Sequence, residues 1–394
     1  MNFTINRDLL LENLTNVSRA LSTKTPMPVL TGIKFEITKS KMFLTASNNE
    51  ISIQAQINEG NKLKLEGEGS FVVPGKILIE IIRKLDANEV QFKAVEDNVI
   101  KIYANRSDFT LNALEKDNFP LISFAESKSF IKLDIGTLKQ IIRKTTFATS
   151  LSESRAILTG VCLNLSNSKL EAISTDSFRL AKIYLNVNEE LPEVSVVIPS
   201  KSLDELNKVI IDDNESDIEL HFSPTKILFK YKNLLFQSRL IDGVYPNTSS
   251  LIPTEFLTSI KFNKAELVKT IDLMSLFTNI ESSNIIQLQL NPDKTVEIKS
   301  TTSEIGEGKE ELIPLECSNP VSFKIAFSAK YFLEAVRSVS YTHLRAHETP
   351  EHLVCRLLLE KKKNTTNKEK ITYLWKTTSN DYYLLTMVLC NAML

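Results

Sequence analysis

Alternating hydrophobic and polar residues mark many short strands along this chain. Examples of this period-two pattern are KFEIT from Lys34, EVQFKAV from Glu89 and IELHF from Ile218. Other segments repeat their apolar residues with helical spacing, namely 6–20, 74–85, 134–147, 199–210, 263–275 and 328–339. The two patterns together predict an α+β chain in which helices alternate with groups of antiparallel strands.

One helical motif, Lys-x-Leu/Phe-x-Glu, occurs three times at intervals of about 127 residues, which indicates an internal repeat. Its three lysines are Lys76, Lys201 and Lys330. Each unit also starts with an earlier helix, for which the expected N-cap residues are Asn6, Asp134 and Asn263. Prolines at 74 and 199 are expected in the first turn of the later helix. We therefore predict three similar domains, at 1–126, 127–252 and 253–339.

Charge is unevenly distributed, although 47 Lys+Arg and 48 Asp+Glu give a net charge of only −1. The six predicted helices hold 14 basic and 9 acidic residues, which leaves the rest of the chain acidic. Basic residues that contact phosphates bind a nucleic acid without reading its sequence. The helices are therefore candidates for a phosphate-facing surface, although mixed charge is also ordinary for a solvated helix. No helix-turn-helix, zinc-finger or RNA-binding signature is present, which disfavours sequence-specific recognition.

Composition excludes several other classes of protein. The 4 cysteines form no CxxC pair, which argues against a disulfide scaffold or a zinc ribbon and fits a reducing cytoplasm. No signal peptide and no apolar run long enough to span a membrane is visible. The chain has only 10 glycines and no GxxxxGK loop, so a nucleotide cofactor is not predicted.

Six longer motifs resemble the bacterial DNA sliding clamp, the beta subunit of DNA polymerase III. They are TPMPVL at 25–30, NFPLI at 118–122, SESRAILTGV at 152–161, STDSFRLA at 174–181, IDGVYPN at 241–247 and AFSAKYFLEAV at 326–336. The resemblance covers residues 1 to about 339. It implies three domains of the DNA clamp fold, each with two helices packed on antiparallel sheets. It also implies a processivity factor that is not an enzyme and needs neither metal nor cofactor. Such a clamp is a head-to-tail homodimer whose ring encircles duplex DNA and tethers the replicative polymerase.

The resemblance implies two kinds of sequence-independent contact with DNA. Lys24, in the loop before Pro26, matches a basic position that touches DNA, and the loop with Ser150 and Ser152 matches another. The diffuse remainder is expected from basic helix residues, namely Arg7, Lys76, Arg83, Lys139, Arg143, Lys201, Lys208, Lys264 and Lys330. Without the resemblance, Lys24 could be an ordinary exposed loop lysine.

The resemblance also implies a pocket for short peptides of the DNA polymerase III alpha subunit, the clamp loader and other partners. The matching positions are Leu158, Thr175, Ser177, Phe178, Arg179, Leu180, Pro246 and Leu251. An apolar groove with an arginine at its rim suits an aromatic or aliphatic anchor. The family usually has histidine where Phe178 stands and a small residue at Ser177. Without the resemblance, Leu158 and Leu180 would be interpreted as core residues.

Ring closure would join the first domain of one protomer to the third domain of its partner. Phe109 and Leu111 match interface positions in the first domain, and Leu276 and Phe277 match them in the third. Exposed apolar pairs on edge strands otherwise favour aggregation, so an interface accounts for them better than a free surface does.

The segment 340–394 does not repeat the pattern of the first two units. Its sequence SYTHLRAHETPEHLVCRLLLEKK resembles translated adaptor sequence, so we interpret the segment as artefactual and the third domain as truncated. His343, His347 and His352, with Cys355 nearby, have a spacing that zinc ligands can use. A metal-dependent hydrolase is therefore one alternative, although Pro350 interrupts the helix that would align these ligands. A general protein-interaction scaffold without a DNA role is the other alternative.

Overall fold

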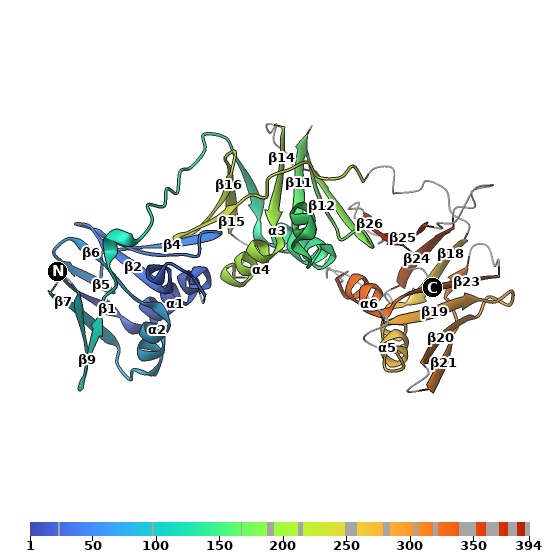
Figure 1. The fold of residues 1–394 in the computed structure, drawn as a ribbon, viewed down its shortest axis with the longest axis horizontal. Helices are drawn as coiled ribbons and strands as arrows, with labels where there is room; N and C mark the ends of the chain where they lie inside the picture. The colour runs from blue at the N-terminus through green and yellow to red at the C-terminus, as the bar shows by residue number, and fades with distance from the viewer. Residues whose placement is uncertain are drawn as a thin grey trace. The chain divides into compact units, whose positions relative to one another are not determined.

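The structure is a computed structural model of the 394-residue chain. It describes residues 1–22, 24–96, 98–166, 168–186, 193–211, 216–248, 258–278, 284–302, 306–317, 322–338, 352–359, 370–376 and 384–390. The chain divides into two compact units (Figure 1). Unit 1 comprises Met1–Leu138 and Lys201–Leu240, and unit 2 comprises Lys139–Ser200 and Ile241–Leu394. Within the described part, none of the helices is long and apolar enough to cross a membrane.

The six predicted helices are all present, each slightly shorter than the sequence pattern suggests. They are α1 (Arg7–Val17), α2 (Gly75–Lys84), α3 (Ile135–Thr145), α4 (Ser200–Val209), α5 (Lys264–Ser275) and α6 (Ala329–Ser338). The predicted N-caps are confirmed at Asn6, Asp134 and Asn263. Each side-chain oxygen accepts a hydrogen bond from the backbone N–H three residues later, at 3.1, 2.8 and 3.2 Å respectively. These local bonds explain why the helices begin where they do.

The repeated motif has the same burial in all three helices that carry it. Its central residues Leu78, Leu203 and Phe332 are buried, whereas its lysines are exposed. The two prolines lie one residue earlier than predicted, because Pro74 ends strand β6 (Gly69–Pro74) and Pro199 ends strand β14 (Val194–Pro199). A proline without an N–H is tolerated at such a strand end, and its fixed φ directs the chain into the helix.

Unit 1 contains two antiparallel sheets, of which the first has the order β5-β1-β7-β8-β9. Its strands are β1 (Asn2–Asn6), β5 (Leu63–Glu66), β7 (Glu89–Glu96), β8 (Val99–Ala104) and β9 (Ser107–Asn112). Four buried or nearly buried phenylalanines, Phe3, Phe35, Phe71 and Phe92, stack in the core beneath it. Offset aromatic stacking of this kind adds to the stability that apolar burial gives.

The second sheet of unit 1 has eight strands in the order β10-β15-β16-β17-β4-β3-β2-β6. The strands not yet given are β2 (Gly32–Ile37), β3 (Lys41–Ser47), β4 (Ile51–Asn58), β10 (Phe130–Asp134), β15 (Asp217–Phe222), β16 (Lys226–Tyr231) and β17 (Leu234–Arg239). β4 belongs to the first predicted domain and β17 to the second, and the two pair with Leu234 opposite Ala55. One continuous sheet therefore crosses the predicted boundary between these domains.

Unit 2 contains three sheets, with the orders β13-β12-β11-β14, β22-β18-β24-β25-β26 and β21-β20-β19-β23. Its other strands are β11 (Gly160–Ser166), β12 (Lys169–Thr175), β13 (Leu180–Asn186), β18 (Thr258–Asn263), β19 (Ile285–Leu290), β20 (Val296–Thr302), β21 (Gly306–Leu312), β22 (Glu316–Cys317) and β23 (Phe323–Ser328). Helices α5 and α6 lie side by side (Figure 1). They share one apolar core with β19 and β20, which includes Ile271, Ile286 and Phe332.

The third domain has further strands after Val339, although the sequence beyond that residue does not match the repeat of the first two units. β24 (His352–Leu359), β25 (Lys370–Lys376) and β26 (Leu384–Cys390) extend the sheet from β18, with Ile260 opposite Cys355. Apolar runs such as HLVCRLLL can form a strand without the alternation that identifies one from sequence. Of the proposed zinc ligands, His343 and His347 lie outside the described residues.

Candidate functional site

A tight turn between β12 and β13 carries the centre of the predicted peptide pocket. The Oδ1 atom of Asp176 accepts hydrogen bonds from the backbone N–H groups of Phe178 and Arg179, both at 2.9 Å. The hydroxyl of Thr175 donates to the carbonyl of Arg179 at 2.6 Å. Ser177 has a φ of +77°, a conformation that a small side chain tolerates better than a branched one. The turn is therefore fixed by its own side chains.

Arg179 is buried and fully engaged, where the sequence analysis expected an arginine at the rim of a groove. Its Nε atom donates to Asp176 Oδ2 at 3.0 Å, and its Nη1 atom donates to Glu334 on α6. The guanidinium also lies 4.3 Å from the ring centroid of Tyr331 and 5.4 Å from that of Phe147. A planar cation between two rings and two carboxylates is held in one orientation. Arg179 thus joins the turn to α6 within unit 2.

An apolar floor lies under this turn. Leu180, Cys162, Ile173 and Val197 form a buried cluster, and Ile157, Ile241 and Tyr245 pack against it. The hydroxyl oxygen of Tyr245 accepts the backbone N–H of Thr175 at 3.0 Å. Burial raises the pKa of the Tyr245 hydroxyl far above its usual range, and it raises the pKa of the Cys162 thiol to about 11. Both groups therefore stay neutral at physiological pH, which keeps the floor uncharged.

The predicted pocket residues divide into an exposed group and a buried group. Phe178 is 47% exposed, and Ser177 and Pro246 are exposed as well. Leu158 and Leu180 are buried, as their interpretation as core residues requires. Leu251 lies outside the described residues. Among the described residues of this set, Phe178 is a large apolar side chain that is exposed.

Sequence reasoning missed the contribution of α6 to this site. The ring of Tyr331 lies 6.4 Å, centroid to centroid, from that of Phe178 and is tilted by 31°. Burial is the main cause that raises the pKa of Tyr331. Tyr331 and Glu334 both belong to the motif AFSAKYFLEAV, so the signal was present, but the motif was used only to identify the repeat and the family resemblance.

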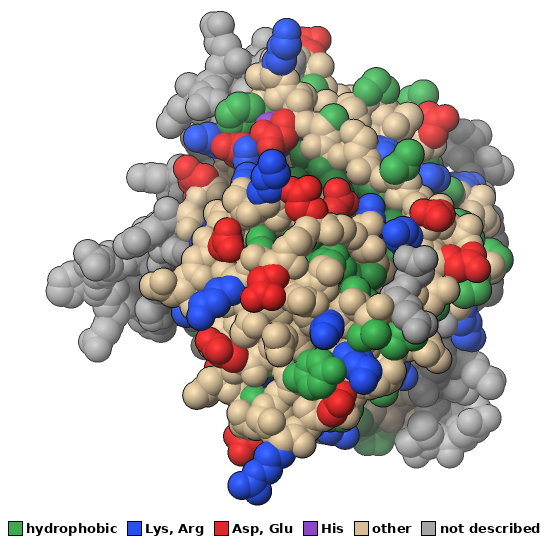
Figure 2. Space-filling model, turned by 90° about the vertical axis from the view of Figure 1, so that its left-hand side faces the viewer, with side chains coloured by type: hydrophobic (Ala, Val, Ile, Leu, Met, Phe, Trp, Pro, Cys, Tyr) green, Lys and Arg blue, Asp and Glu red, His purple; other side chains and the backbone are tan. Residues whose placement is uncertain are grey.

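Most of the basic residues predicted to contact DNA are accessible. The exposed ones are Lys24, Lys76, Arg83, Arg143, Lys201, Lys208 and Lys330, and Ser152 is exposed too. The partly buried ones are Arg7, Lys139, Ser150 and Lys264. On the face drawn in Figure 2, basic and acidic side chains are interspersed, so no patch of a single charge dominates that face.

Arg7 has a structural task that the sequence did not reveal. Its Nε atom donates to the carbonyl of Ile82 at 3.0 Å, and its Nη2 atom donates to the carbonyl of Arg83. These carbonyls belong to the last turn of α2, where helical partners are missing and a positive charge is favourable. Arg7 also pairs with Asp8 at 2.7 Å. Arg7 is thus held within its own unit by three contacts of its guanidinium.

Two of the predicted interface residues lie on a terminal strand, and the other two directly follow helix α5, next to another terminal strand. β9 is the last strand of its sheet in unit 1, and it carries Phe109 and Leu111, both half-buried. β21 is the last strand of a sheet in unit 2, and its Gly308 packs against the ring of Phe277. A Cβ atom on Gly308 would lie only 2.8 Å from that ring, so the contact depends on glycine. Leu276, beside Phe277, is 67% exposed.

Comparison with known sequences covers each of the three predicted domains. The N-terminal domain of the DNA polymerase III beta subunit matches residues 1–123, and the central domain matches residues 132–247. The C-terminal domain matches residues 249–369. This match therefore continues beyond Val339 into the segment 340–394, which the sequence alone led us to interpret as artefactual. The three domain types follow one another in the same order as the predicted repeat.

Whole-chain relatives agree with the domain matches. The beta sliding clamp of Bacillus subtilis is 37% identical over 355 residues, which are 89% of this chain and 93% of the relative. That of Staphylococcus aureus is 36% identical over 343 residues, 86% of this chain and 90% of the relative. The crystal structure of the sliding clamp from Bacillus subtilis has a TM-score of 0.89 at 33% identity, with 100% of both chains covered. The chain therefore belongs to the DNA polymerase III beta subunit family, the bacterial sliding clamps, and is a processivity factor.

Proposed function

We propose that this chain works as a clamp through three surfaces: basic helices for duplex DNA, a peptide pocket around Phe178, and two sheet edges that close a homodimer. The observation that carries the proposal is the consecutive match of all three domain types together with the fixed turn beneath Phe178. The chain's task is mechanical, since it holds a polymerase on its template, and the proposal assigns it no catalytic residue. We place this task in the bacterial cytoplasm.

Contacts with DNA are proposed to be weak and non-specific. Exposed lysines such as Lys76, Lys201 and Lys330 recur at one position of the repeated motif, so equivalent helices would present equivalent charges. Phosphate contacts of this kind release counterions and allow a protein to slide, whereas base contacts would hold it at one sequence. Retention would then come from closure of a ring around the duplex.

Partner binding is proposed at the surface formed by Phe178, Pro246 and Tyr331. An exposed aromatic ring next to a second ring can accept an aromatic or aliphatic side chain of a short peptide. The polymerase alpha subunit and the clamp loader are the partners that we propose. Since Arg179 is already held by Asp176 and Glu334, it would shape this surface more than it would bind peptide directly.

Ring closure is proposed between β9 of one protomer and β21 of its partner. Both are terminal strands, so each has backbone N–H and C=O groups that could pair with a further strand. Phe109 and Leu111 accompany the first edge, and Leu276 and Phe277 lie beside the second. A head-to-tail arrangement uses two different edges and closes into a ring when the rotation allows it.

A loading experiment tests the topological mechanism. The full chain is loaded onto nicked circular DNA with a bacterial clamp loader and ATP, and the DNA is then cut once at a site away from the nick. We expect stable retention on the circle and rapid loss after linearisation. A parallel sample with both DNA ends blocked by bound protein should retain the clamp. Equal retention on circular and open linear DNA would contradict closure around the duplex.

The two alternative functions have no support within the described part of the chain. A tail-based hydrolase needs His343 and His347, which lie outside the described residues. A scaffold without a DNA role does not account for the match of all three clamp domains.

A further inference from the structure

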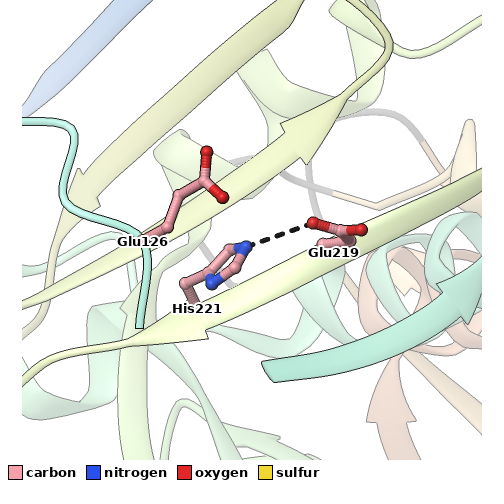
Figure 3. Close-up of side chains that lie close together, drawn as sticks. All are labelled: Glu126, Glu219 and His221. Atoms are coloured by element: carbon pink, nitrogen blue, oxygen red, sulfur yellow. Dashed lines mark ion pairs between the residues drawn. The ribbon is translucent and has the colours of Figure 1, made fainter. Parts of the chain in front are cut away.

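Three potential metal ligands converge in unit 1, and none of them is among the residues proposed to contact DNA, a peptide or a second protomer. Glu126 lies a few residues before β10, and Glu219 and His221 lie two apart on β15, so they project from the same face of that strand. One ligand atom from each residue lies within 4.8 Å of the other two (Figure 3). The group therefore joins the segment that leads into the second domain to a strand of the eight-stranded sheet.

The ring of His221 is held in a defined orientation. The residue is only 3% exposed, and its Nδ1 atom lies 3.2 Å from the carbonyl oxygen of Ser127. The hydroxyl of Ser127 lies 3.4 Å from the same Nδ1 atom but donates its proton to the carbonyl of Ser129. A carbonyl oxygen can only accept a hydrogen bond, so Nδ1 is assigned the proton and acts as the donor. The Nε2 atom of a neutral ring then carries a free lone pair. A backbone carbonyl fixes the tautomer of metal-binding histidines in the same way.

The Nε2 atom is buried and has no hydrogen-bond partner among the described residues. It faces Glu219, whose Oε2 atom lies 3.4 Å away (Figure 3). In the neutral form of the ring, a lone pair would thus face a carboxylate oxygen. Two acceptors in contact repel each other unless a proton or a cation lies between them, and a buried polar atom without a partner is costly.

We propose that Glu126, Glu219 and His221 form a binding site for a divalent transition-metal ion, with Zn²⁺ as the ion that fits best. One imidazole nitrogen and two carboxylate oxygens are ordinary zinc ligands, and three protein ligands leave a fourth position for water. Calcium and magnesium prefer sites made of oxygen alone, so the imidazole disfavours them.

Two lysines compete for the same carboxylates. The Nζ atom of Lys230 lies 2.8 Å from Glu126 Oε2 and 3.6 Å from Glu219 Oε2, and that of Lys132 lies 3.9 Å from Glu219 Oε1. The hydrogen bond between Lys230 and Glu126 lowers the pKa of the carboxyl and raises that of the ammonium. Both lysine side chains are a third or more exposed, so they can turn to solvent. A metal ion would replace the ammonium of Lys230 between the two carboxylates.

The bound ion would fasten the segment before β10 to β15. Glu126 is half-exposed and precedes the strand, and its carboxylate accepts a hydrogen bond from Lys230. An ion that binds the folded state alone stabilises it by mass action. The expected consequence is a zinc-dependent rise in the melting temperature of unit 1, independent of DNA and of partner peptides.

The test measures Zn²⁺ binding by isothermal titration calorimetry on the full chain carrying His343→Ala and His347→Ala, which removes two competing histidines. We expect one zinc ion per chain at this site. Glu126→Gln should weaken the binding of Zn²⁺ at least about tenfold. Loss of a residue that only hydrogen-bonds to a metal ligand already lowers metal affinity by about that factor, and Glu126 would be a ligand itself. Lys230→Met should strengthen binding, because it removes the competing charge. Glu50→Gln, an exposed glutamate elsewhere in unit 1, is the matched control and should change nothing.

The side chains of Glu126 and Lys230 are both partly exposed, so the protein should stay folded after either substitution. Circular dichroism verifies this. His221→Asn serves as a further variant and should abolish the site. The proposal is overturned if the Glu126→Gln and Glu50→Gln proteins bind zinc equally well, or if the Lys230→Met protein binds none. In that case the cluster is an ion-paired network of Glu126, Glu219 and Lys230 beside His221.

Discussion

The carboxylate of Glu334 on α6 accepts a hydrogen bond from the guanidinium of Arg179, in the turn between β12 and β13. The corresponding glutamate of α4, Glu205, forms an ion pair of 3.4 Å with Arg19, just after α1. In both cases the glutamate of the repeated motif reaches an arginine of the preceding domain. In α2, in the first predicted domain, Glu80 pairs with Arg83 of its own helix, and Glu205 pairs in the same way with Lys208 of α4. The repeat therefore encodes contacts between domains as well as a helix.

Replacing Arg179 by alanine should destabilise unit 2. The change leaves the buried carboxylate of Asp176 and the partly exposed one of Glu334 without their cation, so we expect a loss of about 3 kcal/mol in unfolding free energy. Urea denaturation measures the effect. Glu334→Gln keeps a hydrogen-bond acceptor beside Arg179 and should cost clearly less. Equal losses in the two variants would show that the charge of Glu334, and not the burial of Arg179, determines the stability of this contact.

Replacing Phe178 by alanine should weaken partner binding with little effect on folding. Because its ring is about half exposed and forms the accessible part of the site, we expect a loss of about 2 kcal/mol in binding, or roughly thirtyfold in Kd. Fluorescence polarisation with a labelled clamp-binding peptide gives the Kd. The fully exposed Leu121 provides the control Leu121→Ala. An unchanged Kd for Phe178→Ala would place the peptide elsewhere.

Removing a helix lysine should change how DNA binding depends on salt. If Lys201 contacts a phosphate, Lys201→Ala should reduce the slope of log K against log salt by about one. The measurement is a salt series of binding to duplex DNA of mixed sequence. Lys41→Ala removes an exposed lysine from strand β3 instead and should leave the slope unchanged. The same slope for all three proteins would remove Lys201 from the DNA-binding surface.

A charge beside the edge of β21 should prevent ring closure. Leu276 is 67% exposed in the single chain and is proposed to be covered in the dimer. Leu276→Asp would place a carboxylate in that apolar contact, so we expect monomers in sedimentation equilibrium at concentrations where the unsubstituted chain is dimeric. Val244→Asp alters an even more exposed residue, which belongs to the second predicted domain, and should preserve the dimer. Dimers of Leu276→Asp would argue for a different interface.

The buried Lys144 near the end of α3 should give the stability a defined pH dependence. Burial, and next the charge of Arg143, lowers the pKa of its ammonium to about 8, whereas the unfolded chain keeps a value near 10.4. Between pH 8 and about 10.4, Lys144 binds more protons in the unfolded state than in the folded state. The unfolding free energy should therefore rise with pH over this range. Lys144→Met lacks this contribution, so the unsubstituted chain should gain stability relative to it. Urea midpoints at pH 7.5 and 9.5 measure this, and parallel changes in both proteins would refute it.

Local signals predicted the elements of this fold well. Asn6, Asp134 and Asn263 cap helices as expected, because an N-cap bond reaches only three residues along the chain. Alternation placed strands such as β7 and β15 correctly, because successive side chains of a strand point to opposite faces. The peptide pocket was predicted less completely. The family resemblance supplied the positions of its residues, but it did not show which other residues contact them. Tyr331, which lies beside Phe178, was not among those positions.

The sequence by itself determined the α+β class, the three-fold repeat, the helix starts and the clamp family, because these depend on short-range periodicity and on motifs read in order. Only the tertiary structure decided that Arg7 caps α2, that Arg179 is buried against α6, and that His221 faces two glutamates. The partners of Arg7 and Arg179 lie far from them in the chain, and so does Glu126, one of the two glutamates near His221. Whether a charged side chain meets solvent, a carbonyl or a carboxylate depends on which distant segments fold against it, and no local pattern contains that information.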